Sequence, residues 1–232
     1  MKTLRDPISS VTHLIGGFLS ILVTVLFMVK QIFSEEFHGT LFASTIIFGL
    51  ALCLLYFTSG IYHAISATKV KLVKFMQKLD HSMIFVLIAG SYSPFCLYVL
   101  PKSKGVPLLI GLWVIALLGI LCKIFWIDMP RVLSTGIYII MGWAALFVVK
   151  DLYFALDKIA FELLVAGGLF YTIEGIADGK PEILLIDQRF TVRYYFDILE
   201  RGIDKRTIVQ HGKTYSQCRS VFLIVAAVHF QI

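Results

Sequence analysis

Charged side chains are scarce in this sequence. They make up 16% of its 232 residues, whereas hydrophobic residues make up 58%. A soluble domain is nearer one half apolar and one quarter charged. The apolar residues also come in long runs, and a run of about 18 or more can cross the hydrocarbon core of a bilayer as a helix. The composition therefore favours an integral membrane protein over an unusually apolar soluble one.

Several other features are missing. The chain has only four cysteines, and three of them lie in apolar segments. They indicate small buried side chains rather than a disulfide framework. There is no phosphate-binding loop, no GxSxG elbow and no HExxH motif. The net charge of +6 does not indicate nucleic-acid binding, because many lysines and arginines flank apolar runs, as membrane-topology signals do.

Seven apolar segments are candidate membrane spans. They cover residues 11–33, 41–66, 81–100, 107–127, 132–150, 158–175 and 220–232. The first five are long enough to cross, Glu174 interrupts the sixth, and the seventh is short. We predict an all-α integral membrane protein, a seven-transmembrane helix bundle. Helices one to six would occupy residues 1–173, and a short last helix would occupy 220–232.

Residues 174–219 differ in kind from the spans. They mix eight basic and seven acidic residues and include the strand-like stretch EILLIDQRFTVRYYF. We expect an atypical cytoplasmic loop or a small subdomain before the last helix. An insertion, a shifted reading frame and a divergent segment would each account for it.

The placement of lysine and arginine predicts the orientation. With the N-terminus in the cytoplasm, the inner segments hold most of the basic residues, including the four lysines between 69 and 78. Cytoplasmic segments carry such an excess. We therefore expect a multi-pass protein with a cytoplasmic N-terminus and membrane lipids around it.

Three polar residues stand at the edges of apolar runs. Ser59 and His63 are one helical turn apart, so they share a face of the second span, and Asp80 directly precedes the third span. We expect the three to meet near the inner edge of the membrane, where an imidazole, a carboxylate and a hydroxyl form a plausible zinc site. Two plainer alternatives are an interfacial His63 facing headgroups and an Asp80 that caps the third span.

Four segments of the sequence resemble the successive signatures of a known family. DPISSVTH, SGIYHAI, LDHSMIFVLIAGSYSPF and GGLFYTI are similar to those of the hemolysin III-like proteins, the bacterial branch of the progestin and adipoQ receptor family. The similarity is clear over residues 5–173 and loose over the last twelve. It implies a seven-helix bundle in the bacterial cell (inner) membrane. It also implies a zinc site near the cytoplasmic face, matching Ser59, His63 and Asp80, and metal-dependent hydrolase chemistry.

The sequence departs from the family pattern near its end. The family's remaining zinc ligands come from an HxxxH motif, which is absent here. Matching His229 to a later histidine of the family puts Arg219 and Tyr215 at the two ligand positions. The weaker candidate ligands are Glu174, His13 and His211. We expect zinc to bind weakly or not at all.

Three functions fit these features. In the first, the protein hydrolyses a lipid-like amide or ester, with His63 as a metal ligand, Asp80 orienting or deprotonating a water, and Ser59 holding that water. In the second, it is a non-enzymatic receptor, a regulator of membrane energetics or a pore-forming, cytolytic protein. In the third, it is a degenerate member with a folded bundle and no activity.

Overall fold

The computed structural model describes residues 5–126, 130–156 and 158–177, apart from some side chains after residue 130. Every secondary-structure element of the described part is a helix. The chain divides into two compact units, residues 1–148 and 149–232, which are considered separately. The predicted all-α membrane class is confirmed by five helical segments that are long enough and apolar enough to cross a bilayer.

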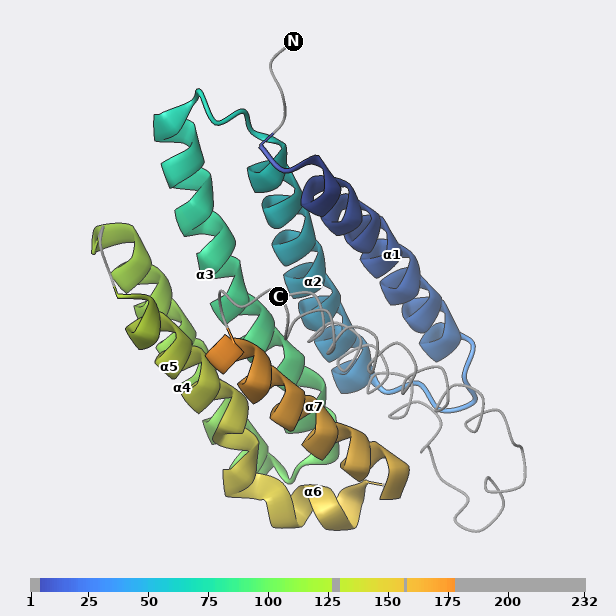
Figure 1. Ribbon diagram of the computed structural model, residues 1–232. Coiled ribbons are helices and arrows are strands. Elements are labelled where there is room, and N and C mark those ends of the chain that lie inside the picture. Colours follow the sequence, from blue (N-terminus) through green and yellow to red (C-terminus); the bar gives the residue numbers. More distant parts are fainter. Residues whose placement is uncertain (1–4, 127–129, 157, 178–232) are drawn as a thin grey trace. The chain divides into compact units, whose positions relative to one another are not determined.

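The first unit begins with three long helices that follow one another as antiparallel neighbours. They are α1 (Pro7–Ile32), α2 (Gly39–Ala64) and α3 (Val70–Pro94). Helix α1 packs on α2, and α2 packs on α3 (Figure 1). In the 18-residue apolar stretch of each helix, 50% is buried for α2 and 61% for the segment of α3, against 11% for α1. Helices α2 and α3 therefore form the centre of this unit.

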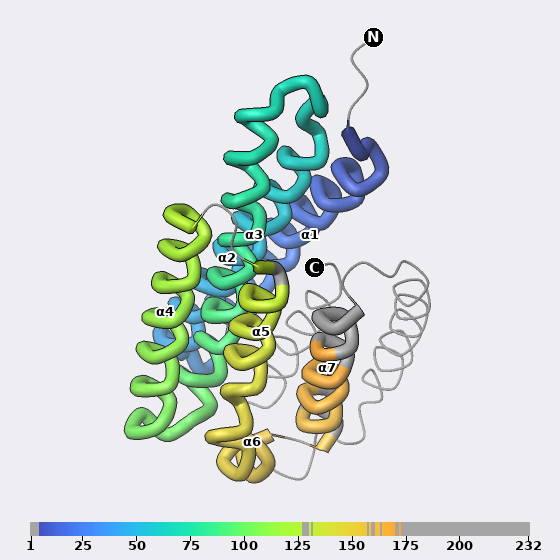
Figure 2. The backbone as a smooth tube through the Cα atoms, turned by 60° about the vertical axis from the view of Figure 1, so that its left-hand side comes forward, coloured from blue at the N-terminus to red at the C-terminus, as the bar shows by residue number. Residues whose placement is uncertain are grey.

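The remaining elements of the unit also pack against α3. A π-helical turn, η1 (Phe95–Val99), follows Pro94, and α4 (Lys102–Phe125) packs on α3. Helix α5 (Arg131–Gly142) contacts both α3 and α4 and passes into a 3₁₀ segment, η2 (Trp143–Val148) (Figure 2). The Tyr92 hydroxyl donates to the Gly142 carbonyl and accepts from the Ala145 amide. These two hydrogen bonds connect α3 to the junction at which α5 passes into η2.

The five long spans correspond to the first five predicted ones, but α3 starts much earlier than predicted. It begins at Val70 rather than residue 81, so the basic segment before Asp80 is helical and not a connecting loop. Lysine is a good helix former, and the helix continues past the end of its apolar run. The fifth span is the helical run Val132–Ala155.

The second unit contributes α6 (Val149–Ala155) and α7 (Lys158–Ala177). Helix α7 covers the predicted sixth span, although it is not among the five segments that qualify by length and hydropathy. The predicted segment 174–219 lies almost wholly, and the predicted seventh span 220–232 entirely, outside the described residues. The count of seven helices therefore stays a prediction.

Candidate functional site

Ser59 and His63 lie in the last two turns of α2. Their spacing of one turn places them on one face of the helix, as predicted. Ser59 is buried, with 8% of its surface exposed, and His63 is half-buried. Helix α2 ends one residue after His63, at Ala64. Both side chains therefore lie at the end of α2 that faces the start of α1.

The start of α1 is fixed by Asp6 and Pro7. The Asp6 side chain accepts hydrogen bonds from the Ser9 amide at 3.3 Å and the Ser9 hydroxyl at 2.7 Å. Aspartate is a preferred N-cap, and proline suits the first helical position. The hydrogen bond from the Ser9 hydroxyl, followed by that from its amide, lowers the pKa of the Asp6 carboxyl below its ordinary value.

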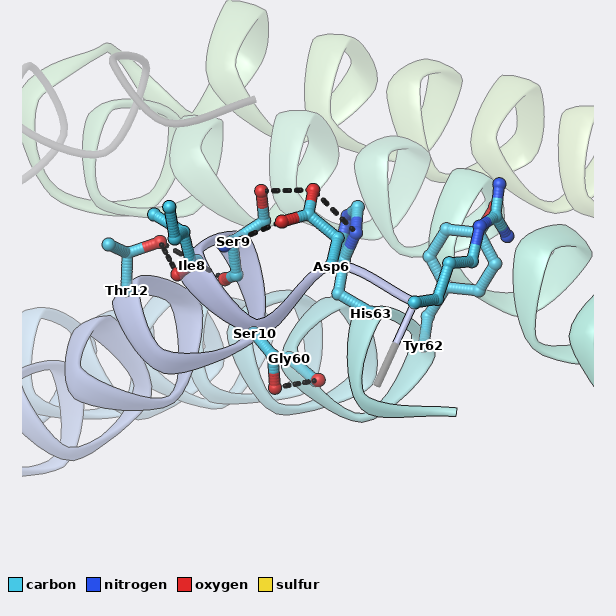
Figure 3. A network of polar contacts seen from close by, with 9 residues as sticks. Asp6, Ile8, Ser9, Ser10, Thr12, Gly60, Tyr62 and His63 are labelled. Carbon is cyan, nitrogen blue, oxygen red and sulfur yellow. Dashed lines mark hydrogen bonds and ion pairs between the residues drawn. The ribbon is translucent and has the colours of Figure 1, made fainter. Parts of the chain in front are cut away.

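The same aspartate faces His63. Its Oδ2 lies 3.8 Å from His63 Nδ1, and its backbone amide donates to the His63 carbonyl at 3.3 Å (Figure 3). The side-chain distance is longer than a hydrogen bond, so the pair is ionic only when the imidazole is protonated. One turn further along α1, the Ser10 hydroxyl donates to the Gly60 carbonyl at 2.9 Å. These contacts hold the start of α1 against the end of α2.

Asp6 was not among the predicted site residues. The Asp-Pro pair directly before an apolar run is a recognisable helix-start signal, so the capping role of Asp6 could be predicted from the sequence. Its contact with His63 was not, because it joins residues 57 positions apart across a helix pair.

The surroundings of His63 are aromatic and basic. The His13 ring, from α1, lies 5.5 Å from the His63 ring between centroids. Arg5 donates to the Tyr62 hydroxyl at 2.7 Å, and its guanidinium lies 4.9 Å from the centre of the Tyr62 ring. Of the weaker candidate ligands, the structure thus brings His13 beside His63.

Asp80 lies within α3 and does not cap it. The N-cap position of α3 is Lys69, so the capping alternative was wrong. Asp80 lies about 15 Å along the helix axis from Val70. It therefore does not stand at the start of its helix, which was the reason for expecting it at the same membrane depth as His63. Asp80 is half-buried, and the carbonyl of the next residue, His81, accepts a hydrogen bond from the Tyr138 hydroxyl of α5 at 2.8 Å. The convergence of Asp80 with Ser59 and His63 stays a prediction.

The carboxylate that the structure places against His63 is Asp6. A catalytic zinc usually takes three protein ligands and a water. Within residues 5–126, 130–156 and 158–177, no three histidine, cysteine, aspartate or glutamate side chains are grouped to hold a metal ion. Glu174 lies in α7, but its side chain is not described, and His211 lies outside the described residues. The described part of the chain therefore does not by itself fit a zinc site.

Comparison with known proteins identifies the family behind this arrangement. A family model described as "Haemolysin-III related" matches residues 1–177. The chain belongs to the haemolysin-III related family. No solved structure matches it.

Two haemolysin-III relatives are similar over the same part of the chain. The "Hemolysin-3 homolog" of Bacillus subtilis (strain 168) is 39% identical over 175 residues, which are 75% of this chain and 80% of that protein. The "Hemolysin-3" of Bacillus cereus is 38% identical over 170 residues, 72% of this chain and 75% of that protein. The family match and the five spans together make this a multi-pass membrane protein. The family match stops at residue 177, which agrees with the predicted atypical C-terminal region.

Proposed function

We propose that this haemolysin-III related chain is a protein of the bacterial cell membrane with a cytoplasmic N-terminus. We propose that it has the fold of a hydrolase that acts on lipid-like amides or esters. We further propose that it binds zinc weakly and that its hydrolysis is impaired. One observation carries this proposal: the sequence has Ser59, His63 and Asp80, which match the family pattern, but it has no HxxxH motif to supply the remaining ligands.

The residues that remain would have separate tasks in such a site. The Asp80 carboxylate would orient or deprotonate a water molecule, and the Ser59 hydroxyl would hold that water by a hydrogen bond. His63 is held at the end of α2 with Asp6 beside its Nδ1. The substrate would come from the bilayer, because α1 and α2, which carry the site, are both long enough and apolar enough to cross it.

The test is hydrolysis of fluorogenic lipid amides and esters by the purified chain and by an Arg219→His, Tyr215→His double variant. We expect little turnover by the unmodified chain and more by the double variant. In the double-variant background, Ser59→Ala or Asp80→Asn should remove the gain. Turnover by the unmodified chain that survives both of these substitutions would contradict the proposal.

A second function, membrane lysis, is favoured by the relatives' names, since one Bacillus protein is called "Hemolysin-3" and the other "Hemolysin-3 homolog". Lysis would not need a metal site, so it would be insensitive to chelator. The measurement is dye release from liposomes containing the purified chain, with and without chelator. Release equal to that from protein-free liposomes would exclude lysis.

A further inference from the structure

The early start of α3 arranges its lysines along one side of a helix. Lys69 precedes the helix, and Lys71 and Lys74 lie three residues apart in its first turns; all three are exposed. Lys78 is different, because it is half-buried and donates to the Ile124 carbonyl at the end of α4 at 3.1 Å. Its charge is therefore directed at another helix, while the first three point to the surroundings.

The length of the helix indicates what those surroundings are. The span Val70–Val99 has 30 residues, which at 1.5 Å each is about 45 Å, against a hydrocarbon core of about 30 Å. Residues 81–100 contain no aspartate, glutamate, lysine or arginine and alone match that core. The first ten residues of α3 would then extend into the headgroup region.

Apolar side chains accompany these lysines. Phe75 is 61% exposed, Val70 is 59% exposed and Leu72 is 41% exposed. Phe75 follows Lys74 directly and is four residues from Lys71, so its ring lies on the lysine side of the helix. A helix with lysines and exposed apolar residues suits the boundary between headgroups and acyl chains.

The stretch of sequence that leads into and begins α3 carries charge of one sign. No aspartate or glutamate occurs between Glu36 and Asp80. Lysines near a helix N-terminus oppose the helix dipole, so helix stability does not account for them. A topology signal would require basic residues on this side, but it would not require exposed apolar residues among them.

We propose that Lys69, Lys71, Lys74 and Phe75 form a docking surface for an anionic phospholipid. The lysines would hold its phosphate-containing headgroup, and Phe75 would lie against the start of its acyl chains. This basic surface shares no residue with the site around His63 and does not depend on the proposed hydrolase chemistry.

The test is native mass spectrometry of the full chain, purified in mild detergent, with phosphatidylglycerol or phosphatidylcholine added. A Lys71→Gln, Lys74→Gln variant removes two charges from the basic surface. A Lys30→Gln, Lys102→Gln variant is its matched control, because it removes two exposed lysines at the opposite end of the helices. Circular dichroism of each variant checks that the helices are intact.

We expect phosphatidylglycerol to bind better than phosphatidylcholine, and the first variant to lose about tenfold or more of that affinity. The control should lose little. Raising the salt concentration should weaken binding to the native chain but have less effect on the first variant. Phe75→Ser should weaken binding while keeping its salt dependence. Equal losses in the two lysine variants, no lipid preference, or full competition by inorganic phosphate would each overturn the proposal.

Discussion

At the scale of single residues, Asp6 joins two helices. Its carboxylate caps α1 through Ser9 and also faces His63 Nδ1 at the end of α2. Because 43% of the Asp6 side chain is exposed, the ionic part is weak, and most of the contribution of Asp6 to stability should come from the cap.

We expect Asp6→Ala to lower the free energy of unfolding by about 1 kcal/mol, since losing an N-cap of this kind typically costs that much. Asp6→Ser is the matched control, because serine also caps but is too short to reach His63. Thermal unfolding in detergent, followed by circular dichroism, would measure both variants. If the serine variant is destabilised as much as the alanine variant, the His63 contact matters more than the cap.

The face shared by Ser59 and His63 was predictable, because helical spacing alone determines it. The position of Asp80 relative to its helix start was not. Hydropathy registers the apolar run that begins after Asp80, whereas the helix also includes the lysines before it. The contact between Asp6 and His63 depends on how α1 packs on α2, which no local pattern encodes.

At the scale of helices, the junction between α3 and α4 depends on close backbone approach. After Pro94 the chain forms the π-turn η1, in which the Leu100 amide donates to the Phe95 carbonyl at 2.9 Å. Pro101 has no amide hydrogen to offer the next carbonyl, that of Cys96. A side chain at Gly105 of α4 would overlap this Cys96 carbonyl, so glycine allows α4 to pack against the turn.

We expect Gly105→Ala to lower the free energy of unfolding by about 1–3 kcal/mol, because overpacking a buried contact forces a backbone shift. Gly111→Ala in the same helix is the control, since its Cβ would meet nothing within 4 Å among the described residues. The control should be neutral or gain about 1 kcal/mol in helix propensity. The measurement is the melting temperature of each variant. Equal values for Gly105→Ala and Gly111→Ala would show that the Cys96 contact does not constrain α4.

At the scale of the whole molecule, five membrane helices could be predicted from hydropathy because each is a long apolar run bounded by polar residues. The sixth and seventh could not be settled in the same way. Glu174 interrupts one run, and the other, residues 220–232, lies outside the described residues. The orientation of the bundle remains a prediction from the distribution of basic residues.

Reporter fusions test that orientation. Thr68 lies between α2 and α3, and Glu35 lies between α1 and α2. A fluorescent reporter fused after Thr68 should be active, because we expect that connection in the cytoplasm, and alkaline phosphatase should be active after Glu35. The reverse pattern would mean that the N-terminus is outside.

We propose that this chain has the helices of the haemolysin-III related family but an incomplete zinc site. The most direct test of this proposal is the metal content of the full chain purified in mild detergent, measured beside the Arg219→His, Tyr215→His double variant. Two added imidazoles would supply ligands that zinc prefers. We predict substoichiometric zinc in the unmodified chain and about one zinc per chain in the double variant. Tight, one-to-one zinc in the unmodified chain would contradict the account and direct attention to His13, Glu174 or His211 as the missing ligand.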